Sequence, residues 1–218
     1  MNLNKKIFFL IIVLIGSCTN KPYFCEGDCE NGEGKRIWKE GGSEEGTFID
    51  GKLTGKGEQL LSENSIFKGD TYYGEFIKDL YHGNGIYFDM SEMSYYTGEF
   101  KFGKPDGKGM IKFEQNSKYP NRYYKGEWLN GKRNGFGEKF WGIAGKYTNN
   151  KYVGEWKNDN QHGFGKYTWA DGSYYEGNWF NNEQHGNGKY VFANGEVFEG
   201  VWENGYCKEL ADLLMQEK

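Results

Sequence analysis

The sequence predicts an all-β protein made of consecutive β-hairpins, and three observations support this fold class. Glycine and aromatic residues are frequent, with 34 Gly, 17 Tyr, 16 Phe and 7 Trp among 218 residues. Aromatic side chains favour the pleated surface of a sheet, and glycine favours turns and close backbone approach. The aliphatic residues are concentrated in the first fifteen and the last ten positions. Between them, one glycine and aromatic unit recurs with a fixed internal spacing.

The first segment, residues 1–17, has the pattern of a signal peptide. Lys5 and Lys6 precede an apolar run from Ile7 to Ile15, and small residues follow the run. A helix needs about 20 apolar residues to cross a bilayer, so this shorter run is not expected to remain as a membrane segment. We therefore expect the chain to be exported.

The residues around Cys18 resemble a bacterial lipobox, Ile15-Gly16-Ser17-Cys18, in which the cysteine is lipidated and becomes the new N-terminus. Residues 18–24 would then be a lipidated N-terminus and tether. Thr19 rather than Asp follows the cysteine, which in similar lipoproteins favours the outer over the inner membrane. Ordinary cleavage with an unmodified Cys18 is the alternative.

The other three cysteines are Cys25, Cys29 and Cys207. The first two are close together in a chain expected to be exported, so they predict a local disulfide that leaves Cys207 over. Half of a zinc site is the alternative, but no second Cys/His pair follows at a suitable spacing, and no metal is expected.

The repeat array is expected over residues 25–206. Its unit is clearest at Tyr152-Val153-Gly154-Glu155-Trp156, which His162-Gly163-Phe164-Gly165 follows. Nine residues always separate the first glycine from the Gly-x-Gly pair, whereas successive units start 28, 24, 28, 28, 23 and 23 residues apart. A fixed interior with variable joints indicates two short strands and a tight turn. The glycine positions are 46 and 55, 74 and 83, 98 and 107, 126 and 135, 154 and 163, and 177 and 186.

Alternation within the unit places Tyr152, Gly154 and Trp156 on one face of a strand and Val153 and Glu155 on the other. Glycine between aromatic residues allows neighbouring rings to lie over exposed backbone. The extra residues of the longer units fall in loops around residues 62–65, 116–121 and 145–150. Near residues 32–34 a second half-unit lacks a partner, which predicts an array that begins in mid-repeat.

The recurring pattern Tyr-x-Gly-Glu-Trp, then Asn-Gly or Asn-Asp, then His-Gly-x-Gly resembles the MORN repeat over about residues 27–205. Glu44, in place of an aromatic residue before Gly46, is a departure in an early copy. The resemblance implies an elongated, twisted single antiparallel sheet of stacked hairpins and a role in binding or scaffolding. After the array, residues 207–218 are expected to form a short helix that caps the last hairpin, because Leu210, Leu213 and Leu214 have helical spacing. A partner-binding helix is the alternative.

Three motifs suggest chemistry, but the repeat explains each of them. Gly-x-x-x-x-Gly-Lys occurs three times, yet Leu53, Pro105 and Arg133 stand where a phosphate-binding loop needs Ser or Thr. The histidines at positions 82, 162 and 185 are about 10 Å apart when they come from adjacent hairpins, too far to share a metal, and a role in the turn is expected. The glutamates at positions 75, 99, 127 and 155 are interpreted as a solvated face. No catalytic residue and no cofactor is expected.

The formal net charge is −4, and without Lys5 and Lys6 it is −6, so the mature chain is acidic and nucleic acid is not an expected partner. We expect a non-enzymatic, lipid-anchored scaffold that binds a protein partner at the bacterial cell envelope. A module that binds glycans or lipid headgroups through exposed aromatic residues is the alternative. Pairing between open sheet edges would also allow a homodimer. The candidate binding surface comprises Tyr124, Trp128, Tyr152, Trp156, Trp169, Tyr175, Trp179 and Trp202.

Overall fold

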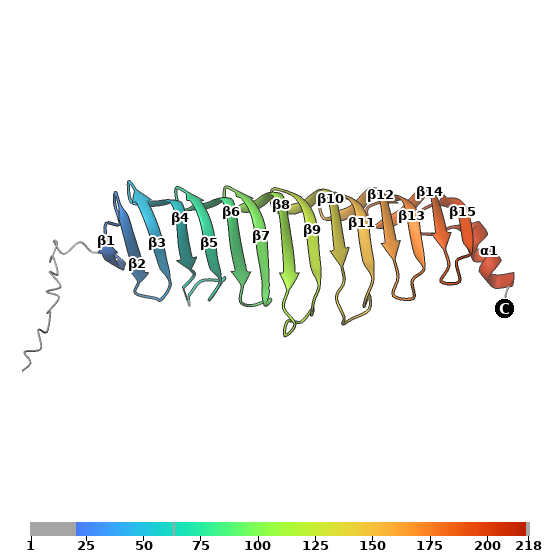
Figure 1. Cartoon of the computed structure of the whole chain (residues 1–218), viewed down its shortest axis with the longest axis horizontal. Coiled ribbons are helices and arrows are strands. Elements are labelled where there is room, and N and C mark those ends of the chain that lie inside the picture. Colours follow the sequence, from blue (N-terminus) through green and yellow to red (C-terminus); the bar gives the residue numbers. More distant parts are fainter. Residues whose placement is uncertain (1–20, 63, 217–218) are drawn as a thin grey trace, which may run out of the picture.

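The computed structural model describes residues 21–62 and 64–216; the predicted signal peptide and Cys18 lie outside the described residues. The described chain forms one antiparallel sheet whose fifteen strands follow one another in sequence order (Figure 1). A single helix, α1 (Lys208–Gln216), follows the last strand and confirms the predicted C-terminal helix. The all-β class and the array of hairpins are therefore confirmed. The strands are β1 (Tyr23–Gly27), β2 (Glu33–Trp38), β3 (Ser43–Ile49), β4 (Lys52–Leu60), β5 (Thr71–Ile77), β6 (Leu80–Asp89), β7 (Ser94–Lys101), β8 (Lys104–Phe113), β9 (Tyr123–Leu129), β10 (Lys132–Phe140), β11 (Lys151–Lys157), β12 (Asn160–Thr168), β13 (Tyr174–Phe180), β14 (Glu183–Val191) and β15 (Val197–Trp202).

Each hairpin from β3–β4 to β13–β14 closes with a two-residue turn of the kind that matches the twist of a β-ribbon. At the β11–β12 turn, Asn158 and Asp159 both have positive φ, 49° and 71°, as a type I′ turn requires. The backbone N–H of Asp159 donates to the carbonyl of Arg133 in the preceding hairpin, at 3.0 Å. Equivalent bonds join neighbouring turns along the sheet, so the turns form a continuous wall. The other two-residue turns are at residues 50–51, 78–79, 102–103, 130–131, 181–182 and 204–205.

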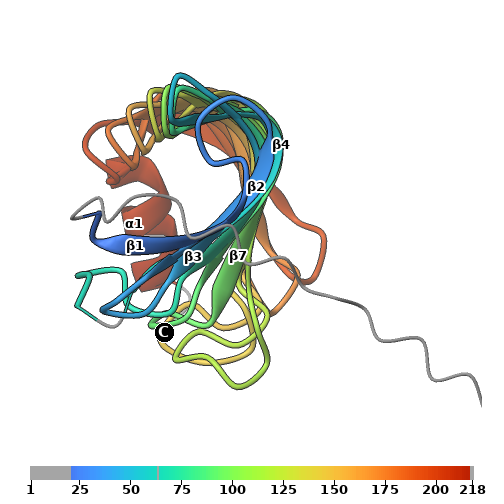
Figure 2. The ribbon, with the colours of Figure 1, turned by 90° about the vertical axis from the view of Figure 1, so that its left-hand side faces the viewer.

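A β-bulge in each hairpin from β3–β4 to β13–β14 bends the sheet into a trough, which is visible when the molecule is viewed along its length (Figure 2). In the β11–β12 hairpin the register shifts between Gly154 and Glu155, where the opposite strand reaches Gly163 with a φ of +55°. A bulge kinks a strand and increases its twist. Because the bulge recurs at the same place in each unit, every hairpin bends in the same direction. The single sheet consequently has a concave face and a convex face.

The repeated glutamate stabilises this bulge. The carboxylate of Glu155 accepts the backbone N–H of Phe164 at 3.0 Å, and Glu75 and Glu99 make the same bond to Asn84 and Lys108. The interpretation of these residues as only a solvated face is incomplete, because their carboxylates satisfy a backbone donor that the bulge leaves without a ladder partner.

Replacing Glu155 by alanine should lower the free energy of unfolding of its hairpin by about 1 kcal/mol, because it removes a charge-assisted hydrogen bond to the backbone. The control is Glu176→Ala, which removes an exposed ion pair with Lys189 and should cost less than about 0.5 kcal/mol. Urea denaturation of the two variants measures both values. Equal losses would mean that the bulge does not depend on the carboxylate.

The aromatic core lies on the concave face and consists of repeated ring pairs over glycine. Tyr152 is fully buried and makes an edge-to-face contact with Trp156, with ring centroids 5.2 Å apart. Its hydroxyl donates to the carbonyl of Glu155 at 3.0 Å, which holds the ring over Gly154 and Gly165. The predicted packing of rings on exposed backbone is confirmed.

The first hairpin is complete, so the prediction that the array begins in mid-repeat is wrong. Strand β1 pairs with β2, and Gly27 lies opposite Gly34. In the frame of the later units, Cys25 and Cys29 occupy the positions of the tyrosine and tryptophan that flank the strand glycine. A disulfide joins the two cysteines. A covalent bond thus replaces the ring pair where the array starts, which sequence comparison missed because neither residue is aromatic.

The long connections lie along one edge of the sheet, and α1 lies at its C-terminal end (Figure 1). The loops at residues 61–70, 114–122 and 141–150 join successive hairpins, as the variable spacing predicts. Leu210 of α1 packs against the C-terminal part of the aromatic core. Cys207 is a buried free thiol, and its sulfur lies close to the position that a Cβ on Gly200 would take. The helix therefore covers ring surface that a further hairpin would otherwise cover.

Candidate binding groove

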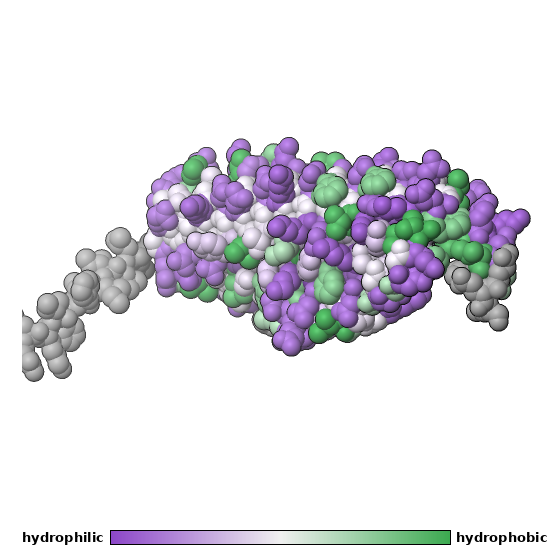
Figure 3. Space-filling model, turned by 45° about the vertical axis from the view of Figure 1, so that its right-hand side comes forward, coloured by the Kyte–Doolittle hydropathy of each residue, from purple (hydrophilic) through white to green (hydrophobic). Residues whose placement is uncertain are grey.

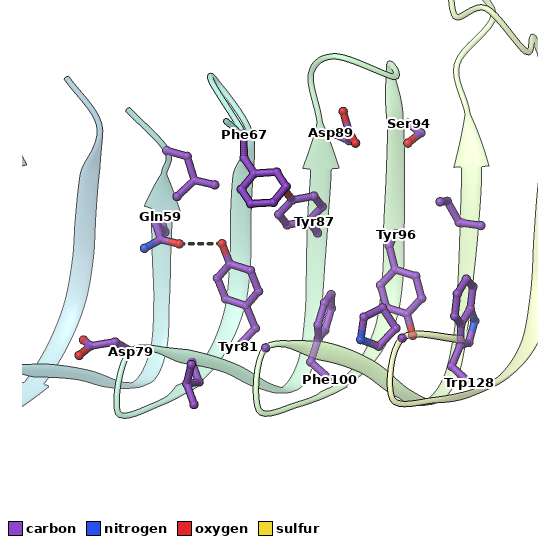
Figure 4. Close-up of a pocket in the computed structure, with 16 residues that line it drawn as sticks. Gln59, Phe67, Asp79, Tyr81, Tyr87, Asp89, Ser94, Tyr96, Phe100 and Trp128 are labelled. Atoms are coloured by element: carbon purple, nitrogen blue, oxygen red, sulfur yellow. Dashed lines mark hydrogen bonds between the residues drawn. The ribbon is translucent and has the colours of Figure 1, made fainter. Parts of the chain in front are cut away.

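The concave face of the trough contains two hollows that follow one another along its length. The first has a volume of about 570 Å³ and is lined by residues of β4, β6, β7, β8 and β9 and of the turns and the connection beside them (Figure 4). Tyr81, Phe100 and Trp128 lie along its base in this view, with Tyr87 and Phe67 on the opposite side. Most of this surface is apolar.

The second hollow lies toward the C-terminus and has a volume of about 410 Å³. Trp141 and Tyr147 come from the connection before β11, and Trp169 comes from the connection after β12. Gln161, which is buried, lines the same hollow, and its side-chain amide nitrogen has no hydrogen-bond partner among the described residues. The two hollows make the concave face a groove that crosses successive repeats.

The structure buries most of the aromatic residues that were expected to form a binding surface. Tyr124, Tyr152, Trp156, Tyr175, Trp179 and Trp202 are core residues, at most 7% exposed. The rings are covered by neighbouring rings and by glycine backbone, so these six side chains are not exposed stacking platforms. Trp128 and Trp169 are half-buried and line the first and the second hollow, respectively. The face drawn in Figure 3 likewise has apolar side chains interrupted by polar ones rather than an unbroken apolar stripe.

Three cationic side chains, Arg122, Arg133 and Lys139, lie between the two hollows and belong to a single repeat. We call them the cation cluster. Arg133 lies over the ring of Trp156, with its guanidinium carbon 4.4 Å from the centroid. The ammonium of Lys139 is 5.9 Å from the same centroid and 4.5 Å from that of Trp141. Both cations are therefore held against the floor of the groove by aromatic faces.

The partners of the three cations differ. Arg133 donates from Nε to the carboxylate of Asp159 at 2.9 Å, which neutralises one charge. Arg122 stacks on Tyr119, with 3.8 Å between its guanidinium carbon and the ring centroid, and its buried Nε has no hydrogen-bond partner in the described chain. Lys139 forms neither a hydrogen bond nor an ion pair with the described residues; its contacts are the two tryptophan rings. Among the ion pairs of the described residues, only the one between Arg133 and Asp159 brings a carboxylate to the cluster, so the cluster carries an excess of positive charge.

In three other repeats the same two positions form a hydrogen-bonded pair. Residues seventeen apart face each other across the hairpin, and in the β11–β12 repeat the amide of Asn150 donates to the hydroxyl of Tyr167 at 2.7 Å. In the β13–β14 repeat the hydroxyl of Tyr190 donates to Ser173 at 3.3 Å. In the β9–β10 repeat these positions hold Arg122 and Lys139, so two cations replace a hydrogen-bonded pair.

The electrostatic consequence is clear at Lys139. Burial first, and then the neighbouring charges of Arg133 and Arg122, lower the pKa of its ammonium from the usual 10.5 to about 7, opposed by Asp159. Burial also lowers the pKa of Arg122. By contrast Arg36, which has the position of Lys139 in the first hairpin, forms a buried ion pair with Glu44 and donates to two backbone carbonyls. The first hairpin therefore pairs the cation at this position with a carboxylate, whereas the β9–β10 repeat pairs none with Lys139.

The three histidines lie in strands at the bulge rather than in the turns, which corrects the expected turn role. The backbone carbonyl of His162 accepts the Tyr152 hydroxyl at 3.4 Å, and its imidazole packs near Phe180, with ring centroids 5.3 Å apart. His82 has the same arrangement with Tyr72 and Phe102. Within residues 21–62 and 64–216, no three His, Cys, Asp or Glu side chains are grouped as metal ligands would be.

A single-layer sheet of stacked hairpins with a groove across the repeats defines a repeat scaffold. More than half of the chain matches the family model described as MORN repeat, at residues 45–62, 72–89, 96–118, 124–142, 152–174 and 175–197. The chain therefore belongs to the MORN repeat family, which is generally non-catalytic. No curated protein matches the sequence closely enough to indicate a relative. In the part of the chain that the structure describes, no helix is sufficiently long and apolar to cross a membrane.

The sequence-based reasoning missed the cation cluster, although a signal for it was present. When the units are aligned on their strand glycines, the position of Arg133 holds Leu53, Tyr81, Pro105, Gln161 or Gln184 in other units. The position of Lys139 holds Gln59, Tyr87, Ile111, Tyr167 or Tyr190 in units other than the first. Three cations at the inward positions of one unit therefore stand out in such an alignment.

Proposed function

We propose that this protein is a non-enzymatic scaffold, exported and lipid-anchored through Cys18, that holds a segment of a protein partner in its concave groove at the bacterial cell envelope. The repeat family supports a scaffold or binding role. The apparent leader and lipobox support export and anchoring, and the disulfide between Cys25 and Cys29 fits an oxidising compartment. Delivery to the outer rather than the inner membrane is part of this proposal.

The groove is the observation that carries this proposal. It crosses the strands along the long axis of the molecule, and its two hollows are separated by about one repeat, with cations between them. A surface with apolar recesses on both sides of a polar site suits an extended polypeptide, whose side chains alternate in chemistry along its length.

Binding of a glycan or a lipid headgroup is the second candidate, because half-buried Trp169 and Trp141 line the second hollow. The burial of Trp156 and Trp179 leaves little ring area for stacking, so a protein partner is favoured.

Strand β1 pairs with β2 alone among the described strands, and the free edge of β1 would pair with a second copy in a homodimer.

The groove can be tested by photocrosslinking in cells with neighbouring positions on opposite faces. Ile111 lines the first hollow, whereas Met110, the preceding residue of β8, faces the convex side. We expect a photoreactive residue at position 111 to capture one protein that position 110 does not, and the purified captured protein to bind the wild type in solution. Equal capture at the two positions, or fluorescence shifts with glycans or liposomes in place of a protein, would contradict the proposal. Loss of palmitate-analogue labelling in Cys18→Ala tests the anchor.

A further inference from the structure

We propose that the cation cluster of Arg122, Arg133 and Lys139 is a recognition site for a carboxylate, the side chain of an aspartate or glutamate in the polypeptide segment that occupies the groove. This inference rests on the proposed function for its source of ligand, but the site itself is defined by this chain's own residues. The cation cluster would select a negatively charged side chain of the bound segment, and the two hollows would accept its apolar side chains.

The first argument is the excess of donors over acceptors. Arg122 Nε and the side-chain nitrogen of Gln161 are buried without hydrogen-bond partners in the described chain, and the half-buried Lys139 lies against two tryptophan rings without a hydrogen bond. Buried polar groups without partners are costly and uncommon in folded proteins. All of these groups donate, so the missing component is an acceptor. Asp159 supplies one carboxylate for three cations, which leaves the cluster in need of further negative charge.

The second argument concerns what kind of anion fits. The cations lie against Tyr119, Trp141 and Trp156, and apolar hollows extend from the cluster in both directions along the groove. A free inorganic ion would satisfy the charge but would leave these surfaces in water. A carboxylate on a polypeptide carries apolar neighbours with it and can form paired hydrogen bonds with a guanidinium.

The third argument is that the cluster is not required for the fold. Two other repeats place neutral residues at the same positions and join them by a hydrogen bond, as Asn150 and Tyr167 do, and the β7–β8 repeat has Ser94 and Ile111 there. A repeat that substitutes two cations for such a pair forgoes that stabilising contact. The arrangement therefore carries a binding function better than a structural one.

The test uses the full mature chain and a synthetic nonapeptide with a central Asp-Glu flanked by Leu and Val, compared with its Asn-Gln counterpart. Tryptophan fluorescence reports binding, because Trp141 and Trp156 contact the cluster. We expect the acidic peptide to bind at least about tenfold more tightly than the amide peptide, with affinity that falls as salt is raised. Lys139→Gln and Arg122→Gln should each remove most of this preference.

The matched control is Lys132→Gln, which removes the same charge from an exposed position on the same strand and should change affinity by less than about twofold. Circular dichroism and thermal melting confirm that the variants are folded. Inorganic phosphate and vesicles containing phosphatidylglycerol serve as separate probes. An equal effect of Lys132→Gln, no preference for the acidic peptide, or binding of phosphate or vesicles without the peptide would overturn the inference.

The two proposals fail in different ways. If position 111 captures a partner whose binding is unchanged by Lys139→Gln, the groove function stands and the carboxylate site is wrong. If the acidic peptide depends on Lys139 but no partner is captured, the site stands and the cellular function is wrong.

Discussion

Replacing Gly165 by alanine should destabilise the centre of the array by about 3 kcal/mol or more. A Cβ at this position would lie 2.3 Å from the Tyr152 hydroxyl oxygen and 2.5 Å from the ring carbon that carries it. Tyr152 cannot move aside, because its side chain is fully buried and its hydroxyl is bonded to the Glu155 carbonyl. Overpacking of this kind costs about 1–3 kcal/mol, and loss of the hydroxyl bond adds about 1 kcal/mol.

The control for this prediction is Gly172→Ala, which separates steric overlap from backbone strain. Gly172 is exposed, has a φ of +88°, and has open space where a Cβ would be. Alanine there should cost only about 1 kcal/mol, the penalty for a side chain in the left-handed region. Urea denaturation and hydrogen exchange of β11–β13 measure both variants. Similar losses at the two glycines would show that ring packing on Gly165 is not the cause.

A double-mutant cycle identifies the ring as the source of the effect. If the clash with Tyr152 is responsible, Gly165→Ala should be much less harmful in a Tyr152→Leu background, because the shorter side chain does not reach the new methyl group. Strictly additive losses would place the strain elsewhere in the hairpin.

Replacing Lys139 by methionine should stabilise the protein by about 2 kcal/mol at pH 6. The pKa of Lys139 is lowered to about 7 by burial and by Arg133 and Arg122, so its charged form is disfavoured in the folded state. The unfolded chain keeps the ordinary pKa of 10.5 and binds more protons between these values. The full shift sets an upper limit of about 5 kcal/mol, which solvent screening and the loss of cation–π contacts reduce.

The pH dependence fixes the sign of this prediction. The destabilisation by Lys139 is complete below about pH 7 and disappears as the pH rises toward 10.5, because the lysine is then neutral in both states. The advantage of Lys139→Met should therefore fall to less than half between pH 6 and pH 9. Parallel urea titrations at the two pH values measure it, with Lys132→Met as the exposed control. A variant less stable than the wild type at pH 6 would contradict the prediction.

If Lys139→Met raises the free energy of unfolding and Lys139→Gln loses peptide binding, Lys139 serves binding at the expense of stability. Sites of this kind are common where a protein holds a charge in place for a ligand. The same substitution at Arg36 should instead destabilise the first hairpin, because that guanidinium is paired with Glu44 and with backbone carbonyls.

Most of the fold could be predicted from the sequence because each hairpin is specified locally. The alternation of Tyr152, Gly154 and Trp156 sets which face is buried, and the Asn158-Asp159 pair sets the turn. A strand in such an array pairs only with its neighbours in the chain, so no long-range pairing had to be inferred. The first hairpin was the exception, because two cysteines take the places of its rings.

The site was less predictable, for a reason that lies in the bend of the sheet. Alternation identified Trp156 and Trp179 as one apolar face, but it could not tell whether their rings would be exposed or covered by neighbouring repeats. In the β11–β12 hairpin the bulge at Gly163 bends the turn half over that face, and equivalent bulges bend the neighbouring hairpins in the same way. This bend buries the rings and creates the groove.

What the sequence determined by itself is the all-β repeat array, the order of its strands and the position of its turns, because these depend on contacts between residues close in the chain. The tertiary structure alone decided that the repeated frame of rings became a core and that Arg122, Arg133 and Lys139 lie near one another between two hollows. Those three residues are brought together only when the strands pair and bend. Their uncompensated charge then becomes a property of the groove rather than of any one segment.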